Sequence, residues 1–338
     1  MIFRFRSFKF RICLGFSVLY LFWAMTLPAV AQGQAGLDLA ILNAGVGARP
    51  LGMGSAFTAI ADNADAPYWN PAGLGLLNKS EITTMQTRLS SDTDHYYVSY
   101  IQPALGGTLG ISWVQVGLGN INQTSAEVDF HNEVQNISIF SYFSNAYLIA
   151  YGKELSDKVS LGLTAKYLNS DMTNIAGGQG SGYSVTPGLL ITISKTDVGT
   201  GLVPVRTDRT TTRVVPTLTL GIKVDELINQ QQWGTGTIER VPPKLRLGLA
   251  YKEPRGSLAG SLFALDLAQT IKPGYSPELS GGYEYSLGGL SLRLGYADSG
   301  LTAGAGFQVN HTRVDYAYVT QRALSRDNVH RISLSGIW

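Results

Sequence analysis

Apolar residues recur at every second position along the chain from residue 81 to its last residue. Within 244–251, for example, leucine or tyrosine alternates with Lys244, Arg246, Gly248 and Ala250. A period of two is that of β-strands, and clusters of Gly, Pro, Asn, Asp and Ser separate the periodic segments. Each predicted strand therefore has one apolar face and one face of polar or small residues.

The periodic segments predict fourteen strands. They cover residues 81–90, 95–102, 107–117, 146–155, 159–170, 183–193, 217–225, 243–251, 258–270, 278–286, 289–296, 301–310, 312–320 and 329–338. An even number is typical of single-chain bacterial outer-membrane barrels, whose apolar face meets lipid and whose wall closes on itself. A soluble β-sandwich alternates in the same way but commonly has shorter strands. The predicted fold class is all-β, a transmembrane antiparallel β-barrel of about 14 strands.

The lengths of the connections support alternating sides of a membrane. Short inner turns are predicted at 156–158, 252–257, 287–288 and 311, and longer outer loops at 118–145, 171–182, 226–242 and 321–328. The connection 194–216 breaks this pattern, because it is long but falls on the inner side. Either it is a periplasmic excursion or the count is wrong by one hairpin there.

The first 31 residues predict an export signal. Four basic residues and no acidic one precede an apolar run over 12–27, and Ala29-Val30-Ala31 forms a small-x-small cleavage site. A retained anchor is the alternative, but the run is shorter than the roughly 20 residues needed to span a bilayer. We expect cleavage after Ala31.

Removal of the signal changes the charge and the cysteine content. Four of the 26 basic residues leave, so 22 face 24 acidic residues and the formal charge becomes −2. This balance gives no indication of a nucleic-acid partner. The single cysteine, Cys13, also leaves, so the mature chain can form neither a disulfide nor a thiolate metal site.

Two segments between the signal and the first strand have a different composition. One is a glycine-rich stretch with Gly45, Gly47, Arg49, Gly52 and Gly54, and the other is an aromatic and Asn-Pro-Ala-Gly block with Trp69, Asn70, Pro71, Ala72 and Gly73. Pro71 excludes Asn70 from the helical region, the Asn70 side chain can close a local turn, and Ala72 and Gly73 allow close backbone approach. A short helix capped by Ser55 is predicted over 56–64.

These two segments together resemble the N-terminal region of the PorV/PorQ family of outer-membrane proteins, which are related to the FadL-type channels. The resemblance implies that an N-terminal segment at 32–80 folds as a plug or hatch into the lumen of a barrel at 81–338, after the predicted signal at 1–31. It also implies a non-enzymatic role as carrier or scaffold for exported proteins, as in type IX secretion. A FadL-like passive channel for small hydrophobic compounds is the alternative.

No constellation in the sequence predicts catalysis, a cofactor or a metal. The four histidines lack ligand spacing, and Asp92, Asp94 and His95 are typical of a solvated hairpin tip. The pairs Asp62/Asp65 and Asp225/Glu226 are interpreted as solvated loop charges. Gly45-x-Gly47 lacks the third glycine of a nucleotide loop. The protein is therefore not expected to be an enzyme.

Polar strand positions and the C-terminus complete the prediction. Lumen-facing positions are expected for Lys166, Lys244, Arg246, Glu284 and Arg293. The last strand carries Ile332, Leu334 and Trp338 on one face and resembles the insertion signal of outer-membrane barrels. The expected location is the bacterial outer membrane. The expected partners are its lipid, secretion-system proteins or exported clients through loops 118–145 and 226–242, or a small hydrophobic ligand.

Overall fold

The computed structural model describes residues 40–90, 93–128, 131, 133–194, 217–253, 259–298, 300–320 and 328–338. The chain divides into two units, Met1–Leu37 and Asp38–Trp338, and every described residue belongs to the second. The predicted signal therefore lies outside the described residues. So does nearly all of the long connection predicted at 194–216, together with most of that at 321–328.

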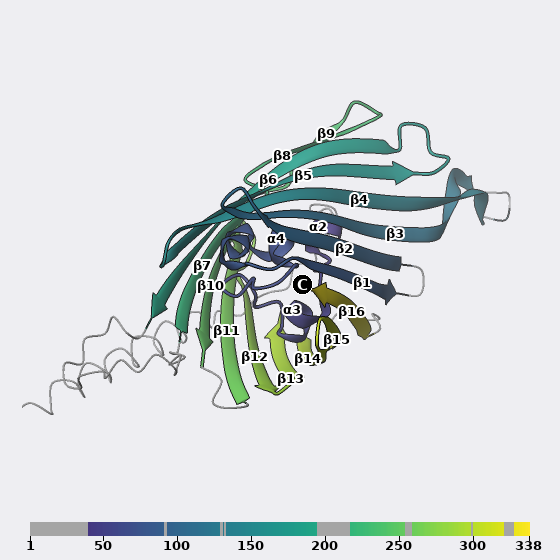
Figure 1. The fold of residues 1–338 in the computed structure, drawn as a ribbon. Coiled ribbons are helices and arrows are strands. Elements are labelled where there is room, and N and C mark those ends of the chain that lie inside the picture. The colour runs from purple at the N-terminus through teal and green to yellow at the C-terminus, as the bar shows by residue number, and fades with distance from the viewer. Residues whose placement is uncertain are drawn as a thin grey trace, which may run out of the picture. The chain divides into compact units, whose positions relative to one another are not determined.

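In the described residues, sixteen antiparallel strands make up one sheet (Figure 1). Their bounds are β1 Glu81–Ser90, β2 Thr93–Ala104, β3 Gly107–Val128, β4 Val134–Ser156, β5 Val159–Met172, β6 Gln179–Ser194, β7 Thr217–Asp225, β8 Ile228–Trp233, β9 Ile238–Glu239, β10 Lys244–Lys252, β11 Ala259–Thr270, β12 Glu278–Leu287, β13 Leu290–Ala297, β14 Gly300–Val309, β15 Thr312–Val319 and β16 Val329–Ile337. Strands β1 and β7 have the predicted bounds.

Fourteen of these strands close into a barrel. The order runs from β5 through β1 to β16, then down to β10, β7 and β6, and β6 pairs with β5. Strands β1 and β16 join the two ends of the wall, where Ser80 and Trp338 exchange backbone hydrogen bonds of 3.1 and 3.0 Å. Closure leaves the wall no free edge, as a hydrocarbon environment requires. The predicted fold class is confirmed.

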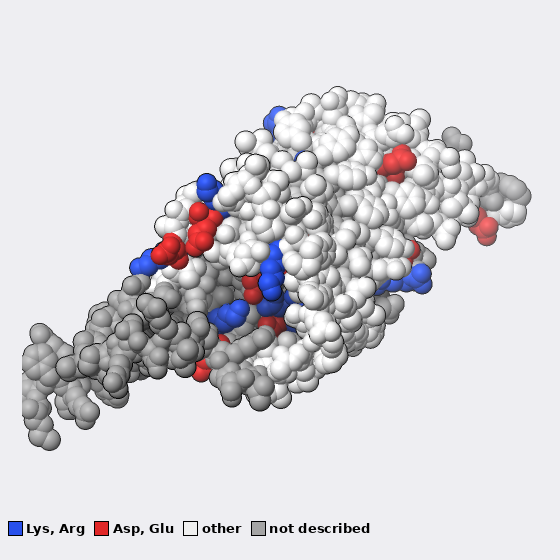
Figure 2. Space-filling view, in the orientation of Figure 1, with Lys and Arg blue, Asp and Glu red and all other residues white. Residues whose placement is uncertain are grey.

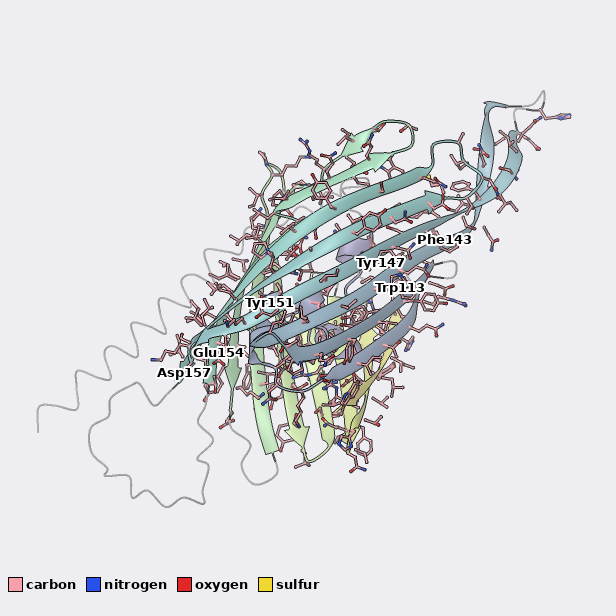
Figure 3. All side chains as sticks on the ribbon, turned by 45° about the horizontal axis from the view of Figure 1, so that its top comes forward. Trp113, Phe143, Tyr147, Tyr151, Glu154 and Asp157 are labelled. Atoms are coloured by element: carbon pink, nitrogen blue, oxygen red, sulfur yellow. The ribbon has the colours of Figure 1, made fainter. Side chains whose placement is uncertain are left out.

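The outer face of the wall is apolar. Leu247 and Leu292 are 42% and 52% exposed, and their neighbours Gly248 and Arg293 are buried in the lumen. An aromatic row crosses four adjacent strands through the cross-strand pairs Trp113↔Tyr147, Tyr147↔Tyr167 and Tyr167↔Tyr183. Charged residues are sparse on the side of the wall that Figure 2 shows, and Figure 3 labels Phe143, Tyr147 and Tyr151 along β4. Such a surface is that of a membrane-spanning barrel.

The rim of the barrel is uneven. Strands β3 and β4 have 22 and 23 residues, whereas β13 and β15 have 8 each. The prediction of a loop at 118–145 is therefore wrong. Residues on both sides of its tip continue β3 and β4 as a projecting two-stranded ribbon (Figure 1). The predicted loop 226–242 likewise contains β8 and β9, which extend the wall beyond β7.

The described part of the N-terminal segment contains four short helices. These are α2 Ala40–Asn43, α3 Ala48–Gly52, α4 Ala66–Trp69 and the 3₁₀ helix η1 Pro71–Leu76. The helix predicted over 56–64 is wrong: this stretch consists of turns, and Ser55 has a positive φ of 66°. No helix in the described part of the chain is long and apolar enough to cross a membrane.

Candidate functional site

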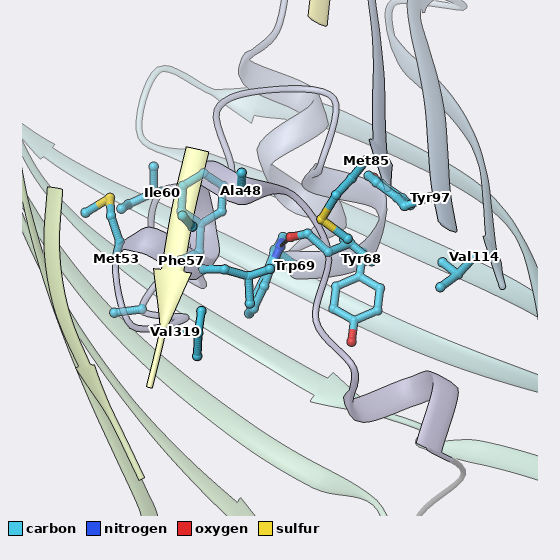
Figure 4. Close-up of a cluster of buried hydrophobic side chains, with 14 of the residues drawn as sticks. Ala48, Met53, Phe57, Ile60, Tyr68, Trp69, Met85, Tyr97, Val114 and Val319 are labelled. Carbon is cyan, nitrogen blue, oxygen red and sulfur yellow. Dashed lines mark hydrogen bonds between the residues drawn. The ribbon is translucent and has the colours of Figure 1, made fainter. Parts of the chain in front are cut away.

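Residues 40–77, called the plug from here on, lie inside the barrel. Their apolar side chains form two cores with lumen-facing wall residues. In the larger one, Phe57 and Trp69 contact edge to face at 6.2 Å between ring centroids (Figure 4). Trp69 donates through its ring nitrogen to the carbonyl of Val46 at 2.9 Å. The Tyr68 hydroxyl bridges the two predicted segments, since it donates to Leu42 O and accepts from Gly45 N.

Glycines on the inner face of the wall receive the plug backbone. A Cβ atom on Gly162 would lie 2.2 Å from the Pro71 carbonyl carbon, and one on Gly295 would lie 2.2 Å from Gly54 N. Five further wall glycines meet plug backbone atoms in the same way: Gly152, Gly221, Gly248, Gly282 and Gly304. Gly110 and Gly188 meet plug side chains instead. The sequence patterns described above did not predict these contacts. Glycine at inner-face positions within strands was the available signal, because it marks close approach of another backbone.

The Asn-Pro-Ala-Gly block forms a corner of the plug. Asn70 has an extended φ of −163°, and its side-chain oxygen accepts from Ala72 N at 3.1 Å. Its amide nitrogen donates to Thr58 O at 2.7 Å, so the same side chain joins two turns of the plug. A Cβ on Gly73 would lie 2.1 Å from Ala61 O. The corner therefore depends on residue types that only this block supplies.

The glycine-rich stretch turns tightly beside the opposite part of the wall. Gly45, Gly47 and Gly54 have φ values of 66°, 77° and 65°, which L-residues rarely adopt. A Cβ on Gly52 would lie 3.2 Å from the Cα of Gly304. Gly47 packs against the Asp65 carboxylate. Both predicted segments are thus packed against the inside of the wall.

The wall also fixes the plug through hydrogen bonds. Asp266 accepts from the backbone nitrogens of Phe57 and Thr58 at 3.0 and 2.9 Å. Ser333 accepts from Ala48 N at 2.8 Å, and Thr164 donates to Pro67 O at 2.8 Å. Because the plug has little regular structure, these bonds satisfy backbone groups that would otherwise be buried without partners.

A chain of alternating charges joins the plug to the wall. Arg49 of the plug contacts Asp62 at 2.5 Å and Glu284 at 2.8 Å, and Arg293 contacts the same Glu284 at 2.6 Å. The full chain runs in the order Asp62, Arg49, Glu284, Arg293, Asp315, Arg313 and Glu81. Among the residues expected to face the lumen, Glu284 and Arg293 are brought together here.

A second charged cluster lies at β5, β7 and β10. Lys166 pairs with Glu226, and Arg246 pairs with Asp225 at 2.6 Å. Lys244 stands apart and pairs with Glu278 at 3.0 Å. The interpretation of Asp225 and Glu226 as solvated loop charges is wrong, because the wall continues past β7 and turns both carboxylates towards lumenal cations.

Two further interpretations of titratable residues need correction. His95 is fully buried rather than at a solvated tip, since it falls on the inner face of β2 while Tyr96 faces outwards. Asp65 is a buried plug residue, 2% exposed, with one carboxylate oxygen that has no partner. Burial, and then the nearby Glu81 carboxylate, raise the pKa of Asp65 to about 7.

The terminal strand presents its apolar side chains outwards. Ile332, Leu334 and Trp338 are 57%, 49% and 58% exposed, and the Trp338 ring stacks on Tyr100 at 6.0 Å between centroids. An outward-facing aromatic at a strand end is typical of the interfacial girdle of a membrane barrel.

One part of the lumen is apolar instead of charged. Val114, Val116, Leu148 and Leu168 are lumen-facing and buried, and they belong to the same core as Ile41 of α2. A narrow pocket with no room for a water molecule adjoins this surface at Leu168. It is lined by Leu42, Leu168, Asn229, Gln230, Gln231, Glu239 and Val241. We call the side chains Val114, Val116, Leu148 and Leu168 with this pocket the apolar chamber.

Comparison with known proteins finds similarity at the level of fold. No family model matches the chain. No curated protein matches it either. Among solved structures, the Pseudomonas putida toluene transporter TodX is 11% identical over 87% of this chain and 97% of its own, with a TM-score of 0.52.

Two other transporters give nearly the same result. The Ralstonia pickettii toluene transporter TbuX is 11% identical over 86% of this chain and 98% of its own, with a TM-score of 0.51. The CymD monoaromatic hydrocarbon channel is 10% identical over 90% and 99%, with a TM-score of 0.51. The chain thus has the fold of FadL-like 14-stranded barrels. These similarities do not confirm the narrower resemblance to the PorV/PorQ family.

Proposed function

We propose that the protein is an outer-membrane channel through which small hydrophobic compounds pass. The observation that carries the proposal is the apolar chamber. A lumen that conducts ions or sugars is polar, whereas here inner-face positions on three adjacent strands, β3 to β5, hold Val114, Val116, Leu148 and Leu168. Apolar lining with a few polar groups is typical of sites for small apolar ligands. The fold shared with transporters named for toluene and monoaromatic hydrocarbons supports the same class of compound.

Uptake of labelled toluene tests this proposal. Host cells that lack such a channel should take up toluene faster when they express the protein than when they carry an empty vector. Leu168→Asp places a charge in the apolar chamber and should return uptake to the vector level. Ile139→Asp is the matched control, because Ile139 is 60% exposed on the projecting ribbon. Vector-level uptake by a folded wild-type barrel would refute the proposal.

A role as carrier for exported proteins is the second candidate. The observation that favours it is the projecting ribbon of β3 and β4, on which Val134, Ile137 and Ile139 are each at least 60% exposed. Exposed apolar side chains outside the wall are typical of protein contact surfaces. If this role holds, a strain without the protein should release a different set of proteins into the medium, and Ile139→Asp should reproduce that change. An unchanged set would eliminate the carrier role.

A further inference from the structure

Two outward-facing basic residues meet where the wall closes between β1 and β16 (Figure 1). Thr87 pairs across the ladder with Arg331, and both side chains are buried in the lumen. The next residues along the two strands, Arg88 and His330, therefore stand side by side on the outer face, and both are exposed. Among the described strand residues, no other basic side chain faces outwards at the end of the wall from which the ribbon projects.

Both side chains keep donors that no described residue uses. Arg88 contacts Asp94 through Nε alone, at 3.3 Å, and the two side chains are 70% and 46% exposed. An exposed ion pair of this kind contributes little, so the guanidinium can turn to another anion. His330 shares a hydrogen bond of 2.7 Å with the Tyr316 hydroxyl through Nδ1, and its Nε2 has no partner within the described ranges. The terminal guanidinium nitrogens of Arg88 and Nε2 of His330 are thus open to a ligand.

Tyrosine rings place this pair near the level of lipid headgroups. The rings of Tyr318 and Tyr316 lie 5.3 and 6.1 Å from that of His330 between centroids. At the other end of β16, Trp338 stacks on Tyr100. Aromatic girdles mark both boundaries of the apolar band in membrane barrels, and that band is about 25 Å tall. The distance from Trp338 to His330 is about 26 Å along the strand. A strand tilt of about 40° reduces it to a height of about 20 Å.

The outer face between the two girdles is apolar beside this pair. Ile332, Leu334 and Val314 are 57%, 49% and 44% exposed on β16 and β15. Acyl chains of a lipid would lie against these side chains while its headgroup reached Arg88. A free anion would leave the apolar surface without a partner, whereas a phosphate-bearing lipid matches both parts of the surface.

We propose that Arg88 and His330 bind the phosphate of a lipid in the membrane leaflet at this end of the barrel. The planar guanidinium of Arg88 would donate to two phosphate oxygens, a geometry that arginine is well suited to. Nε2 of His330 carries a proton when Nδ1 accepts from the Tyr316 hydroxyl, and it would donate to a third oxygen. This lipid site lies outside the lumen, so it does not depend on which compounds the barrel conducts.

Fluorescence quenching by brominated lipids in phosphatidylcholine vesicles tests the site. The only cysteine, Cys13, lies in the predicted signal, so Gln86→Cys offers a single attachment point for a bimane label on the same face of β1 as Arg88. Leu265→Cys, at a position 43% exposed on β11, places the same label on a distant part of the wall. Brominated phosphatidic acid should be preferred over brominated phosphatidylcholine about fivefold at residue 86, as expected for one cation beside an anionic headgroup. At residue 265 the two lipids should quench equally.

Three substitutions in the protein labelled at residue 86 identify the groups responsible. Arg88→Gln should remove the preference for phosphatidic acid, and His330→Leu should weaken it. Because Arg88 and His330 are exposed, neither substitution takes a packed side chain out of the fold. Lys153→Gln is the matched control, since it removes an exposed cation from the opposite end of the wall on β4, and it should keep the preference.

Equal quenching by the two lipids at residue 86 would overturn the inference. A preference that survives Arg88→Gln or His330→Leu undiminished would do the same, because other groups would then hold the lipid. Loss of the preference in Lys153→Gln would show that only net charge matters. Loss of the preference on addition of excess inorganic phosphate would mean that the pair binds free phosphate, which would reject a lipid as the occupant.

Discussion

Glycine decides at single positions whether the plug fits the wall. A Cβ on Gly162 would lie 2.2–2.4 Å from backbone atoms of Pro71 and Ala72, which cannot move without shifting the plug. Gly162→Ala should therefore lower the free energy of unfolding by about 1–3 kcal/mol, the usual range for overpacking. The midpoint of guanidinium unfolding, followed by tryptophan fluorescence in detergent, measures this.

Gly119→Ala is the control for that substitution. Gly119 lies on the projecting ribbon, and a Cβ there would meet no atom within 4 Å. The midpoint of guanidinium unfolding of Gly119→Ala should match that of wild type. If Gly162→Ala were equally harmless, the plug could not lie against β5 as described.

Single residues of β13 also show which face of the strand meets lipid and which faces the lumen. Leu292 is 52% exposed on the outer face, whereas Ser291 lies on the inner face and contacts Ser286 at 3.0 Å. Leu292→Arg should cost about 2–4 kcal/mol near the bilayer midplane, while Ser291→Asp should be tolerated far better. Refolding into lipid vesicles at a series of urea concentrations gives both values. Equal costs would show that the register is wrong.

The raised pKa of Asp65 predicts how the stability of the folded protein depends on pH. Its pKa in the folded protein, about 7, lies above its ordinary value of 3.8, so the folded state binds the proton more tightly. The stability contributed by the neutral carboxyl is complete below pH 3.8 and is lost as the pH rises through 7. Asp65→Asn stays neutral, so its stability relative to wild type should be greater at pH 8 than at pH 5.

The expected difference between those two pH values is about 2–3 kcal/mol, at 1.36 kcal/mol per pKa unit. Comparing the variant with wild type cancels the pH dependence of all other groups. Parallel stability curves for the two proteins would mean that Asp65 titrates normally and is solvated.

Among the elements, the projecting ribbon contributes least to the wall. Strand β2 accompanies β3 only to the pair Thr93↔Leu118, and β5 accompanies β4 only from Tyr142↔Met172. The described ribbon residues between Leu118 and Tyr142 therefore pair with one another, except that Ser141 exchanges hydrogen bonds with Thr173. An isolated two-stranded ribbon is marginally stable. Joining Leu118 to Tyr142 through an Asn-Gly turn should leave barrel stability and toluene uptake unchanged. A barrel that no longer folds would show that the ribbon supports the wall.

The strands were predictable because their signal is local. Period-two alternation placed β1 and β7 at their observed bounds and gave the correct number of wall strands. The same period could not reveal the ribbon, since its apolar residues on β4 follow no single buried face. It also could not reveal β8. Strands β7 and β8 both pair with β6, but the register of this pairing shifts between them around Glu226, a residue with a positive φ of 55°.

The path of the plug was beyond local reasoning. Its turns over 56–64 are held by Asp266, which is 209 residues from Phe57 along the chain, so helix propensity did not decide their conformation. The geometry of Asn70 was accessible, because Pro71 and the side-chain turn act over two residues. The charge chain from Asp62 to Glu81 and the outward pair of Arg88 and His330 depend on strand neighbours that become adjacent only when the barrel closes.

At the scale of the whole molecule, the protein is a closed wall around a tightly packed N-terminal segment. The closed ladder of the wall does not depend on the plug for its backbone hydrogen bonds, whereas the plug depends on the wall for its partners. We therefore expect the plug to occlude the lumen. The apolar chamber lies next to α2.

Planar-bilayer conductance of a variant that lacks residues 43–77 but keeps the signal tests this account most directly. We expect the deleted barrel to insert and to conduct ions far better than the full-length protein, because the lumen loses the segment that fills it. Folding of both proteins is checked by their different mobility on unheated and heated gels. Unchanged conductance in a deleted barrel that is shown to be folded would contradict the account, because the segment would then lie outside the lumen.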